Sequence, residues 1–343
     1  IMVLIQLGGL GIVSFATLLG LLVSGRISLR DRLNTLSEAK IVGADSLPKL
    51  LSRILIVYFG FELVLATYLS LRLHFSYDEG VFQSIWHGTF HAISAFNNGG
   101  FSLYTDSMTG FNQDMFFIAP VMLAVVVGGL GFPVLIELHE RIWRLRLQPG
   151  GKAKRFSLHT RLTLWMTVSL IVLGALFIGA IEWNNPGTLG GLNTWDKLVN
   201  TFFTSIMPRS GGFNSLDISA MDPASWLGID LLMFIGGGSA STAGGIKVTT
   251  IAVLIFIIYT EIRGETAVNV GNRRLPRSIQ RQALTLVALS ATAILLTTLL
   301  FAATTDFSLD EILFDVISAA ATVGLSTGIT ADLPAFHQIW LAF

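Results

Sequence analysis

The sequence contains no cysteine and has few charged residues. The absence of cysteine from its 343 residues excludes disulfide scaffolds, thiolate metal sites and cysteine nucleophiles. Charged residues make up 13% of the chain, against roughly 25% in an ordinary soluble domain. The formal net charge is zero, so the charge balance does not indicate a nucleic-acid partner. With 52% hydrophobic residues and a mean hydropathy of +0.68, the composition is that of a membrane protein.

The first residues also lack the features of a secretion signal. The stretch IMVLIQLGGLGIVSFATLLGLLVSG is apolar from residue 1, with neither the basic n-region nor the small-residue cleavage site of a signal peptide. We interpret it as a spanning helix whose upstream context is missing. The chain is therefore expected to be a fragment of a longer protein.

Apolar windows of about 20 residues are long enough to cross a membrane core of roughly 30 Å. We predict spanning helices near 1–23, 50–71, 115–138, 161–182, 227–259 and 282–303, with another starting near Ile339. The basic residues test this assignment, because 18 of the 22 lie in the segments 26–53, 141–161 and 263–281. The positive-inside rule places these three segments on the cytoplasmic side.

Three further apolar runs are too short to span: 81–96, 196–208 and 310–322. Each ends in a polar stretch that contains glycine. The basic segments stay on one side only if these runs do not cross, so we predict re-entrant helices that enter from the outer side. Irregular backbone at membrane depth is tolerated only where it is buried in protein or lines a water-filled path.

The three re-entrant stretches repeat one another. Gly100, Gly212 and Gly324 follow one another at a spacing of 112 residues, with no gap required in the stretches FHAISAFNNGGFS (90–102), FFTSIMPRSGGFN (202–214) and FDVISAAATVGLS (314–326). A repeat in constant register between spanning helices is the signature of an architecture built from equivalent units.

The repeat predicts an all-α membrane protein with four units of helix, re-entrant pore helix and loop, and helix around a central pore. The first and last units are incomplete, and QLGGLG (6–11) resembles VGGLG (127–131) of the next unit. The predicted divisions are the second helix of repeat 1 plus a cytoplasmic loop at 1–46, repeat 2 at 47–158, repeat 3 with a broken second helix at 159–280, and a truncated repeat 4 at 281–343.

The three loops have the chemistry of an ion selectivity filter. Such filters use backbone carbonyls to replace the water shell of a cation, and glycine permits the positive φ angles that turn carbonyls inward. The C-terminal end of each re-entrant helix carries a partial negative charge that favours a cation. The predicted K⁺ filter residues are Asn98, Gly99, Gly100, Ser210, Gly211, Gly212, Thr322, Val323 and Gly324.

The stretches AFNNGGFS, MPRSGGFNS, FIGGGSASTAGGIKVTT and AATVGLSTG resemble those of the Trk/Ktr/HKT superfamily of potassium transporters, with its bacterial pore-forming subunits of the KtrB and TrkH type. The resemblance implies potassium uptake, with K⁺ as the transported ion and Na⁺ as a second candidate, and neither a cofactor nor enzymatic activity. It also implies a multi-pass protein of the bacterial cytoplasmic membrane. Its implied partners are membrane lipid, a second copy of the chain and a cytosolic nucleotide-binding regulatory subunit.

The span at 227–259 is interrupted by GGGSASTAGG (236–245). One interpretation is close helix packing through small residues, and another is an unwound segment that blocks or opens the pore. The resemblance favours the second, because the family has an intramembrane gating loop here. A phosphate-binding loop is disfavoured because GGIK lacks the Gly-Lys-Ser/Thr order. The predicted gating residues are Gly236, Gly237, Gly238, Ser239, Ser241, Thr242, Gly244, Gly245 and Lys247.

Lys247 and Glu62 fall at membrane depth, where ionisable groups are rare and functional, and Arg209 stands just before the filter glycines of the third repeat. Lys247 could repel ions, hold the loop through its carbonyls, or extend toward cytoplasmic water. Glu62 lies in the middle of 50–71, and a hydrogen-bonded structural role is weighed against a role in ion passage. Arg209 either braces the loop of the third repeat, at 210–212, or is a charge of the outer vestibule.

Two groups of polar residues belong to the outer side. His87 and His91 have the i,i+4 spacing of metal ligands, but no third ligand is evident. Acidic residues near the pore mouth could attract cations or be solvated loop charges: Asp78, Glu79, Asp106, Asp217 and Asp222.

The runner-up function is a cation-coupled secondary transporter with re-entrant hairpins. Such transporters usually contain inverted repeats, whereas every loop here is predicted to enter from the outer side. An intramembrane enzyme is disfavoured because no nucleophile paired with a base, and no metal cluster, is evident. The basic cytoplasmic segments could contact anionic headgroups or dock a cytosolic regulator.

Overall fold

The computed structural model describes residues 1–11, 47–147, 156–264, 267–270 and 273–342. Within these ranges the chain is helical, apart from a two-stranded antiparallel hairpin of β1 (Asn269–Val270) and β2 (Arg273–Arg274). The prediction of an α-helical membrane fold is confirmed, with the hairpin as a small addition to it. Most of the predicted cytoplasmic segment 26–53, namely 26–46, and much of the predicted span 1–23 lie outside the described residues.

The helices follow the predicted order of long helix, half-length helix, loop and second helix. The second unit consists of α4 (Leu47–Tyr77), α5 (Val81–Phe96), α6 (Met115–Leu130) and α7 (Phe132–Leu147). The third consists of α8 (Leu158–Glu182), α9 (Thr194–Ile206), α10 (Pro223–Phe234) and α11 (Val248–Ile262). The fourth consists of α12 (Arg277–Thr304), α13 (Leu309–Ala320) and α14 (Ala335–Ala342), and η2 (Thr109–Phe111) and η3 (Ile329–Ala331) are short 3₁₀ turns in the outer loops.

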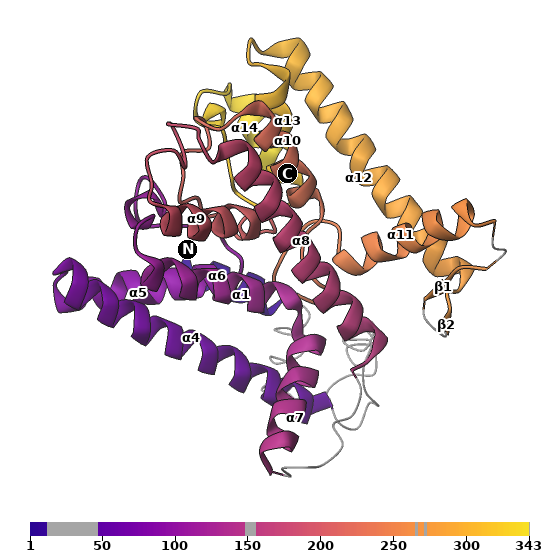
Figure 1. Cartoon of the computed structure of the whole chain (residues 1–343), viewed down its shortest axis with the longest axis horizontal. Helices are drawn as coiled ribbons and strands as arrows, with labels where there is room; N and C mark the ends of the chain where they lie inside the picture. The colour runs from indigo at the N-terminus through magenta and orange to yellow at the C-terminus, as the bar shows by residue number, and fades with distance from the viewer. Residues whose placement is uncertain (12–46, 148–155, 265–266, 271–272, 343) are drawn as a thin grey trace.

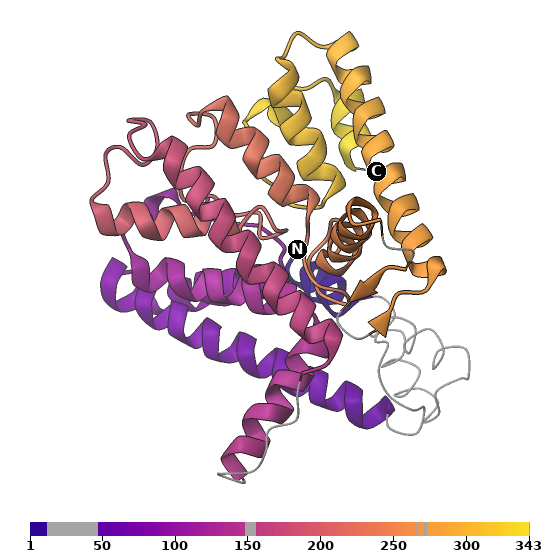
Figure 2. The same ribbon diagram turned by 45° about the vertical axis from the view of Figure 1, so that its right-hand side comes forward.

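The two groups of helices at the ends of the chain lie on opposite sides of the molecule (Figures 1 and 2). In both views α4 and α5 lie side by side at the indigo end, α12 and α13 pack together at the orange and yellow end, and α8 runs between the two groups. Helix α1 (Met2–Leu10) packs against α5. Segments that are more than 200 residues apart in the sequence are thus arranged around one centre.

The long and the half-length helices differ in length and burial. Three helices, α4, α8 and α12, are long and apolar enough to span a membrane, and only 17–22% of their most apolar windows is buried. Their exposed apolar surface is therefore suited to lipid. Helices α5, α9 and α13 have 16, 13 and 12 residues, or about 18–24 Å at 1.5 Å per residue. They are too short to cross a core of roughly 30 Å.

Side-chain caps set where several helices begin. The side chain of Asn193 accepts a hydrogen bond from the backbone of α9, and Asp114 and Asp222 do the same for α6 and α10. Ser308 forms a capping box with Glu311 at the start of α13. Such residues satisfy backbone N–H groups that the first turn of a helix leaves unpaired. The outer ends of these helices are therefore encoded locally.

The expected single span at 115–138 is wrong in its geometry. Helices α6 and α7 meet at a bend of 107°, located at Gly131, where φ is +91°. Gly131 lies against the 239–240 backbone, and a Cβ there would collide with the Ser239 carbonyl oxygen. Helix α1 ends in the same way, at Gly11 with φ +73°. The GGLG sequence shared by both stretches thus ends a helix.

The predicted interruption of 227–259 is present in the structure. Helix α10 ends at Phe234 and α11 begins at Val248, so that residues 235–247 form an irregular segment. An isolated parallel bridge between Ile235 and Ile246 closes the base of this segment. Two units therefore have a second helix that is broken at its glycines.

Close backbone packing holds α4 against α5. A Cβ added at Gly88 would lie 2.6 Å from the backbone nitrogen of Ser70 and 2.8 Å from its Cα, and would also collide with its hydroxyl. The neighbouring core is formed by Leu65, Leu69 and Leu73 of α4. This glycine therefore sets the distance between the long helix and the half-length helix.

We expect Gly88→Ala to destabilise the protein by about 1–3 kcal/mol, because overpacking forces the backbones apart. The measurement is the midpoint of thermal unfolding of the purified protein in detergent. Gly60→Ala in α4 is the matched control, since a Cβ there meets nothing within 4 Å. The control should be neutral or stabilising by up to about 1 kcal/mol, and equal midpoints for both variants would contradict the packing argument.

Candidate functional site: three re-entrant loops and an irregular intramembrane segment

The loops after α5, α9 and α13 share one backbone conformation. Two residues before each repeat glycine, a non-glycine residue has a left-handed φ: +53° at Asn98, +69° at Ser210 and +53° at Thr322. The glycines themselves have φ of +70° at Gly100, +71° at Gly212 and +89° at Gly324. A β-branched residue such as threonine rarely adopts a left-handed φ. Such strain persists only where the surrounding structure holds it.

The loops meet one another. A Cβ added at Gly100 would lie 2.8 Å from the Cα of Gly212 and 3.2 Å from the Val323 carbonyl oxygen. A Cβ at Gly212 would lie 2.7 Å from the Cα of Gly100. Only glycine permits this approach of backbones. The predicted filter residues of the three repeats are thus brought together, while a Cβ at Gly324 would meet nothing within 4 Å.

The electrostatics at this meeting point are those of backbone dipoles. Helices α5, α9 and α13 end at Phe96, Ile206 and Ala320, directly before the loops. Their C-terminal ends carry partial negative charge, and none of the nine predicted filter residues is ionisable. A cation here would be stabilised by carbonyl oxygens and helix dipoles.

A buried carboxylate lies behind the second loop. Glu62 of α4 is 5% exposed and accepts hydrogen bonds from Gln6 Nε2 at 2.7 Å and Asn97 Nδ2 at 2.8 Å. The hydroxyl of Tyr58 donates to Asn97 Oδ1. Of the two roles considered for Glu62, the structure shows the hydrogen-bonded one. Gln6 and Tyr58 were missed in the sequence, because their only signal is a polar atom within an apolar run.

Arg209 lies behind the third loop. It is 7% exposed and contacts α8, where its guanidinium lies 3.3 Å from Thr167 Oγ1. The interpretation as a brace therefore fits its position, and a place in an open vestibule does not.

The irregular segment 235–247 packs against the bend between α6 and α7. Gly238 N–H donates to the Gly129 carbonyl at 2.7 Å, and Phe132 N–H donates to the Ala240 carbonyl at 3.1 Å. The two helix breaks thus satisfy each other's backbone groups. GGLG in the second unit is the functional feature that span prediction overlooked.

The same segment is hydrogen-bonded to the loops. Thr242 Oγ1 donates to Asn98 Oδ1 at 2.7 Å. Gly244 N–H donates to Ser210 Oγ at 2.8 Å, and Ser210 Oγ donates to the Thr322 carbonyl at 3.0 Å. Residues of the predicted gating loop thereby bond to two of the predicted filter loops, and Ser210 links them to the third.

Lys247 lies at the end of this segment, half-buried, and its ammonium donates to the Ala243 carbonyl at 2.6 Å. This contact fits one of the roles considered for the residue, that of holding the loop through a backbone carbonyl. Other residues of the predicted gating loop bond within or beside it, such as Ser241 Oγ to the Gly238 carbonyl and Ser239 Oγ with Thr249 Oγ1.

Comparison with protein families agrees with this geometry. The model of the TrkH family, described as a cation transport protein, matches residues 2–343. The chain belongs to the TrkH family. It is 36% identical over 338 residues to the Ktr system potassium uptake protein B of Bacillus subtilis, a match that covers 97% of this chain and 72% of that protein.

Other relatives of this TrkH-family chain carry similar names. It is 32% identical over 337 residues to the potassium/sodium uptake protein NtpJ of Enterococcus hirae, covering 97% of this chain and 72% of that protein. The crystal structure of the potassium transporter TrkH from Vibrio parahaemolyticus superposes with a TM-score of 0.69 at 17% identity, over 99% of this chain and 67% of that one. That structure shares the fold, and the chain is a multi-pass membrane protein of a transporter family.

The two histidines that have the spacing of metal ligands take other partners in this TrkH-family protein. No group of three potential ligands is present among the described residues. His87 Nδ1 lies 3.1 Å from a Glu79 carboxylate oxygen, and Tyr104 donates to the same carboxylate at 3.2 Å. Burial and the nearby Glu79 charge raise the pKa of the Tyr104 hydroxyl. The hydroxyl therefore stays protonated and can donate.

The other outer acidic residues have local roles. Asp106 accepts from Thr109 Oγ1, Asp217 accepts from Ser219, and Asp222 caps α10. Asp78 adopts a left-handed φ of +53° in the turn after α4. These contacts are those expected of charged residues in solvated loops. The carboxylates also keep negative charge on these loops, as the attraction of cations would require.

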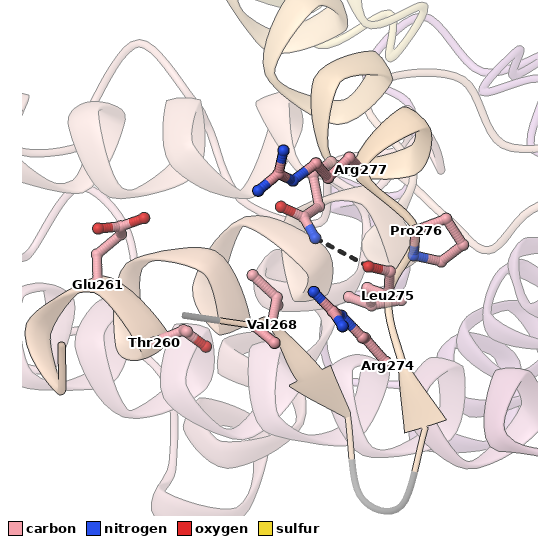
Figure 3. Close-up of a pocket in the computed structure, with 9 residues that line it drawn as sticks. Thr260, Glu261, Val268, Arg274, Leu275, Pro276 and Arg277 are labelled. Carbon is pink, nitrogen blue, oxygen red and sulfur yellow. Dashed lines mark hydrogen bonds between the residues drawn. The ribbon is translucent and has the colours of Figure 1, made fainter. Parts of the chain in front are cut away.

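A cavity of about 480 Å³ lies beside the β1–β2 hairpin and is lined by residues between Thr260 and Gln280 (Figure 3). Figure 3 shows Arg274 and Arg277 across from Glu261, with Gln280 donating to the Leu275 carbonyl. It contains none of the predicted filter or gating residues.

We expect Glu62→Leu to destabilise the protein by about 2–4 kcal/mol, since two buried amide donors lose their acceptor and each unpaired group costs about 1–3 kcal/mol. Glu62→Gln should cost less, because one side-chain oxygen still accepts. The measurement is thermal unfolding in detergent. Equal stability of Glu62→Leu and the wild type would show that the carboxylate does not support the second loop.

Proposed function

We propose that this protein takes up potassium across the cytoplasmic membrane through a selectivity filter of backbone carbonyls. One observation carries the proposal: three loops with the same left-handed backbone meet at the ends of three buried half-length helices. The filter residues are those predicted above, at positions 98–100, 210–212 and 322–324. The names of relatives, Ktr potassium uptake proteins and NtpJ, support K⁺ as the ion, with Na⁺ as a second one.

The proposed filter is a ring of four loops, of which this sequence contributes three. Gly100 and Gly212 are in backbone contact in the structure, so an ion between them requires that the loops stand further apart. A fourth loop inserted into the ring would provide that separation. We also propose the repeat divisions 1–46, 47–158, 159–280 and 281–343, because each of the last three then contains one of the loops.

The segment 236–245 with Lys247 is the proposed gate. Helix α10 descends from the outer loop and α11 continues to the basic segment 263–281, so the segment between them lies on the cytoplasmic side of the filter. It has the small residues that a movable backbone requires. Its hydrogen bonds to Asn98 and Ser210 would hold it across the ion path.

The alternative of a secondary transporter with inverted repeats receives less support. Each half-length helix follows a long helix that begins at the cytoplasmic side, so all units have one orientation. Parallel repeats around an axis along the membrane normal favour a pore.

We also propose partners for the cytoplasmic face. The basic segments 141–161 and 263–281 would contact anionic headgroups and a cytosolic nucleotide-binding regulatory subunit. A homodimer in the bacterial plasma membrane fits the family resemblance. No cofactor and no enzymatic activity are part of the proposal.

The filter is tested with Gly212→Ser in the intact protein, expressed with the flanking sequence of its reading frame. A Cβ at this position collides with the Val323 carbonyl oxygen, so we expect the discrimination of K⁺ over Na⁺ to fall about tenfold, or about 1.4 kcal/mol. The measurements are growth of a strain deficient in potassium uptake at low K⁺ and cation flux in proteoliposomes.

Gly191→Ser is the control, because a Cβ there meets nothing within 4 Å and the residue lies in an outer loop. It should grow and discriminate like the wild type. Full growth of Gly212→Ser with unchanged discrimination would refute the filter assignment.

The gate is tested with Thr242→Val, which removes the hydroxyl that donates to Asn98 Oδ1 and keeps the side-chain volume. We expect K⁺ flux to rise about two- to tenfold, since a hydrogen bond contributes roughly 0.5–1.5 kcal/mol. Thr292→Val on the exposed face of α12 is the control, as its hydroxyl bonds only within its own helix. Unchanged or lower flux at normal membrane levels would contradict the gate.

A further inference from the structure

His91 and Asp315 occupy the same position in two repeats. They are two 112-residue steps apart. Each directly follows the phenylalanine that begins its repeat stretch, Phe90 or Phe314. Both are buried, with exposures of 0% and 4%. The function proposed above uses neither residue.

His91 accepts hydrogen bonds from the chain just beyond the second loop. Its Nδ1 lies 2.8 Å from the His87 carbonyl oxygen, a contact that requires a proton on Nδ1 and leaves Nε2 as the acceptor. Leu103 N–H donates to Nε2 at 3.3 Å, and Ser102 Oγ lies 3.2 Å from it.

Asp315 makes the same contacts beyond the fourth loop. Thr327 N–H donates to Oδ1 at 3.0 Å, and Ser326 Oγ donates to Oδ2 at 2.8 Å. The hydroxyl of Thr330 also donates to Oδ2. Ser326 and Thr327 stand two 112-residue steps after Ser102 and Leu103. An imidazole and a carboxylate, unlike in chemistry, therefore contact the same two repeat positions, a serine hydroxyl and the backbone N–H of the next residue.

The third repeat is held differently. Phe203 stands at the equivalent position and has no acceptor for such bonds. Beyond that loop, Asn214 N–H donates to Ser107 Oγ at 3.2 Å, and the Asn214 carbonyl accepts from Met108 N–H at 2.9 Å. The second repeat's outer loop thus supports the third repeat, which needs no acceptor of its own.

We propose that His91 and Asp315 are positioning residues that fix the outer ends of the second and fourth filter loops and so determine ion discrimination. The inference rests on the proposed filter function. Each loop is held at its inner end by a helix C-terminus, as by the Gly99 N–H to Ser94 carbonyl bond of 2.8 Å and the matching Val323 to Ser318 bond of 2.8 Å. The acceptor holds the other end.

The physical reason is the small tolerance of a carbonyl filter. Its preference between two monovalent cations depends on the number and orientation of the carbonyls. A loop held at only one end can turn its carbonyls toward a smaller ion. Holding both ends keeps the carbonyls in place while the ion is exchanged.

The test compares His91→Phe and His91→Asn in the intact protein. Phe203 shows that a phenylalanine fits this helix position, so His91→Phe fills the space and removes the acceptor. Asparagine supplies an oxygen on a side chain as short as that of Asp315, which accepts from the equivalent backbone N–H. With about two hydrogen bonds lost, we expect His91→Phe to reduce discrimination about tenfold and His91→Asn to retain it within about threefold.

The fourth repeat gives a second pair. Asp315→Leu should lose discrimination and Asp315→Asn should retain it, because the asparagine oxygen still accepts from Thr327. His87→Asn is the matched control: it changes a histidine one turn away that bonds to Glu79, and it should discriminate like the wild type. The readout is the ratio of K⁺ to Na⁺ permeation in proteoliposomes, which does not depend on the amount of folded protein.

The outcomes separate this inference from the proposed function. Wild-type discrimination in His91→Phe, or an equal loss in His91→Asn and His91→Phe, would overturn the positioning role. If Asp315→Leu does not fold, the His91 pair decides. If the wild type itself moves no K⁺, or Gly212→Ser discriminates normally, then the proposed filter fails instead.

Discussion

The structure depends on one constraint: backbone N–H and C=O groups at membrane depth must find partners, because lipid offers none. Five stretches of the described chain leave the helical hydrogen-bond pattern: the three glycine loops, the bend between α6 and α7, and the irregular segment 235–247. They lie against one another, so that Gly238 bonds to Gly129 beside the bend and Gly244 bonds to Ser210 of the third repeat's loop. Each break supplies donors and acceptors for another. The long helices α4, α8 and α12 surround these breaks and present apolar surface outward.

The repeat is one of backbone and not of side chains. Left-handed φ angles recur at Asn98, Ser210 and Thr322, yet the groups that hold the loops differ. A carboxylate, Glu62, supports the second loop, and an arginine, Arg209, lies behind the third. This fits a site built of backbone carbonyls. A cation there would contact the backbone oxygens, while any side chain of suitable reach can hold the backbone in place. Three copies can therefore diverge in sequence and keep one geometry.

The sequence predicted those features whose signal is local. Half-length helices follow from apolar run length, and the break after Phe234 follows from consecutive glycines. The bend at Gly131 was missed because 115–138 is apolar except for Glu137, and the glycine acts through contact with the 239–240 backbone. His91 was considered in the sequence only as a metal ligand. Its role as a hydrogen-bond acceptor was missed, because the bond from Leu103 N–H forms only once the loop has folded back against α5. Contacts of this kind require the fold.

Hydrogen bonds make the proposed filter and the proposed gate one polar network. Segment 235–247 bonds to Asn98 through Thr242 and to Ser210 through Gly244, and Ser210 bonds in turn to Thr322, at distances of 2.7–3.0 Å. Each such bond contributes about 1 kcal/mol, so breaking the two bonds that join the segment to the loops involves about 2 kcal/mol, within the usual size of coupling between sites. Linkage is reciprocal. A cation that orders the loops must therefore change the stability of the proposed gate by the same amount that the gate changes cation binding.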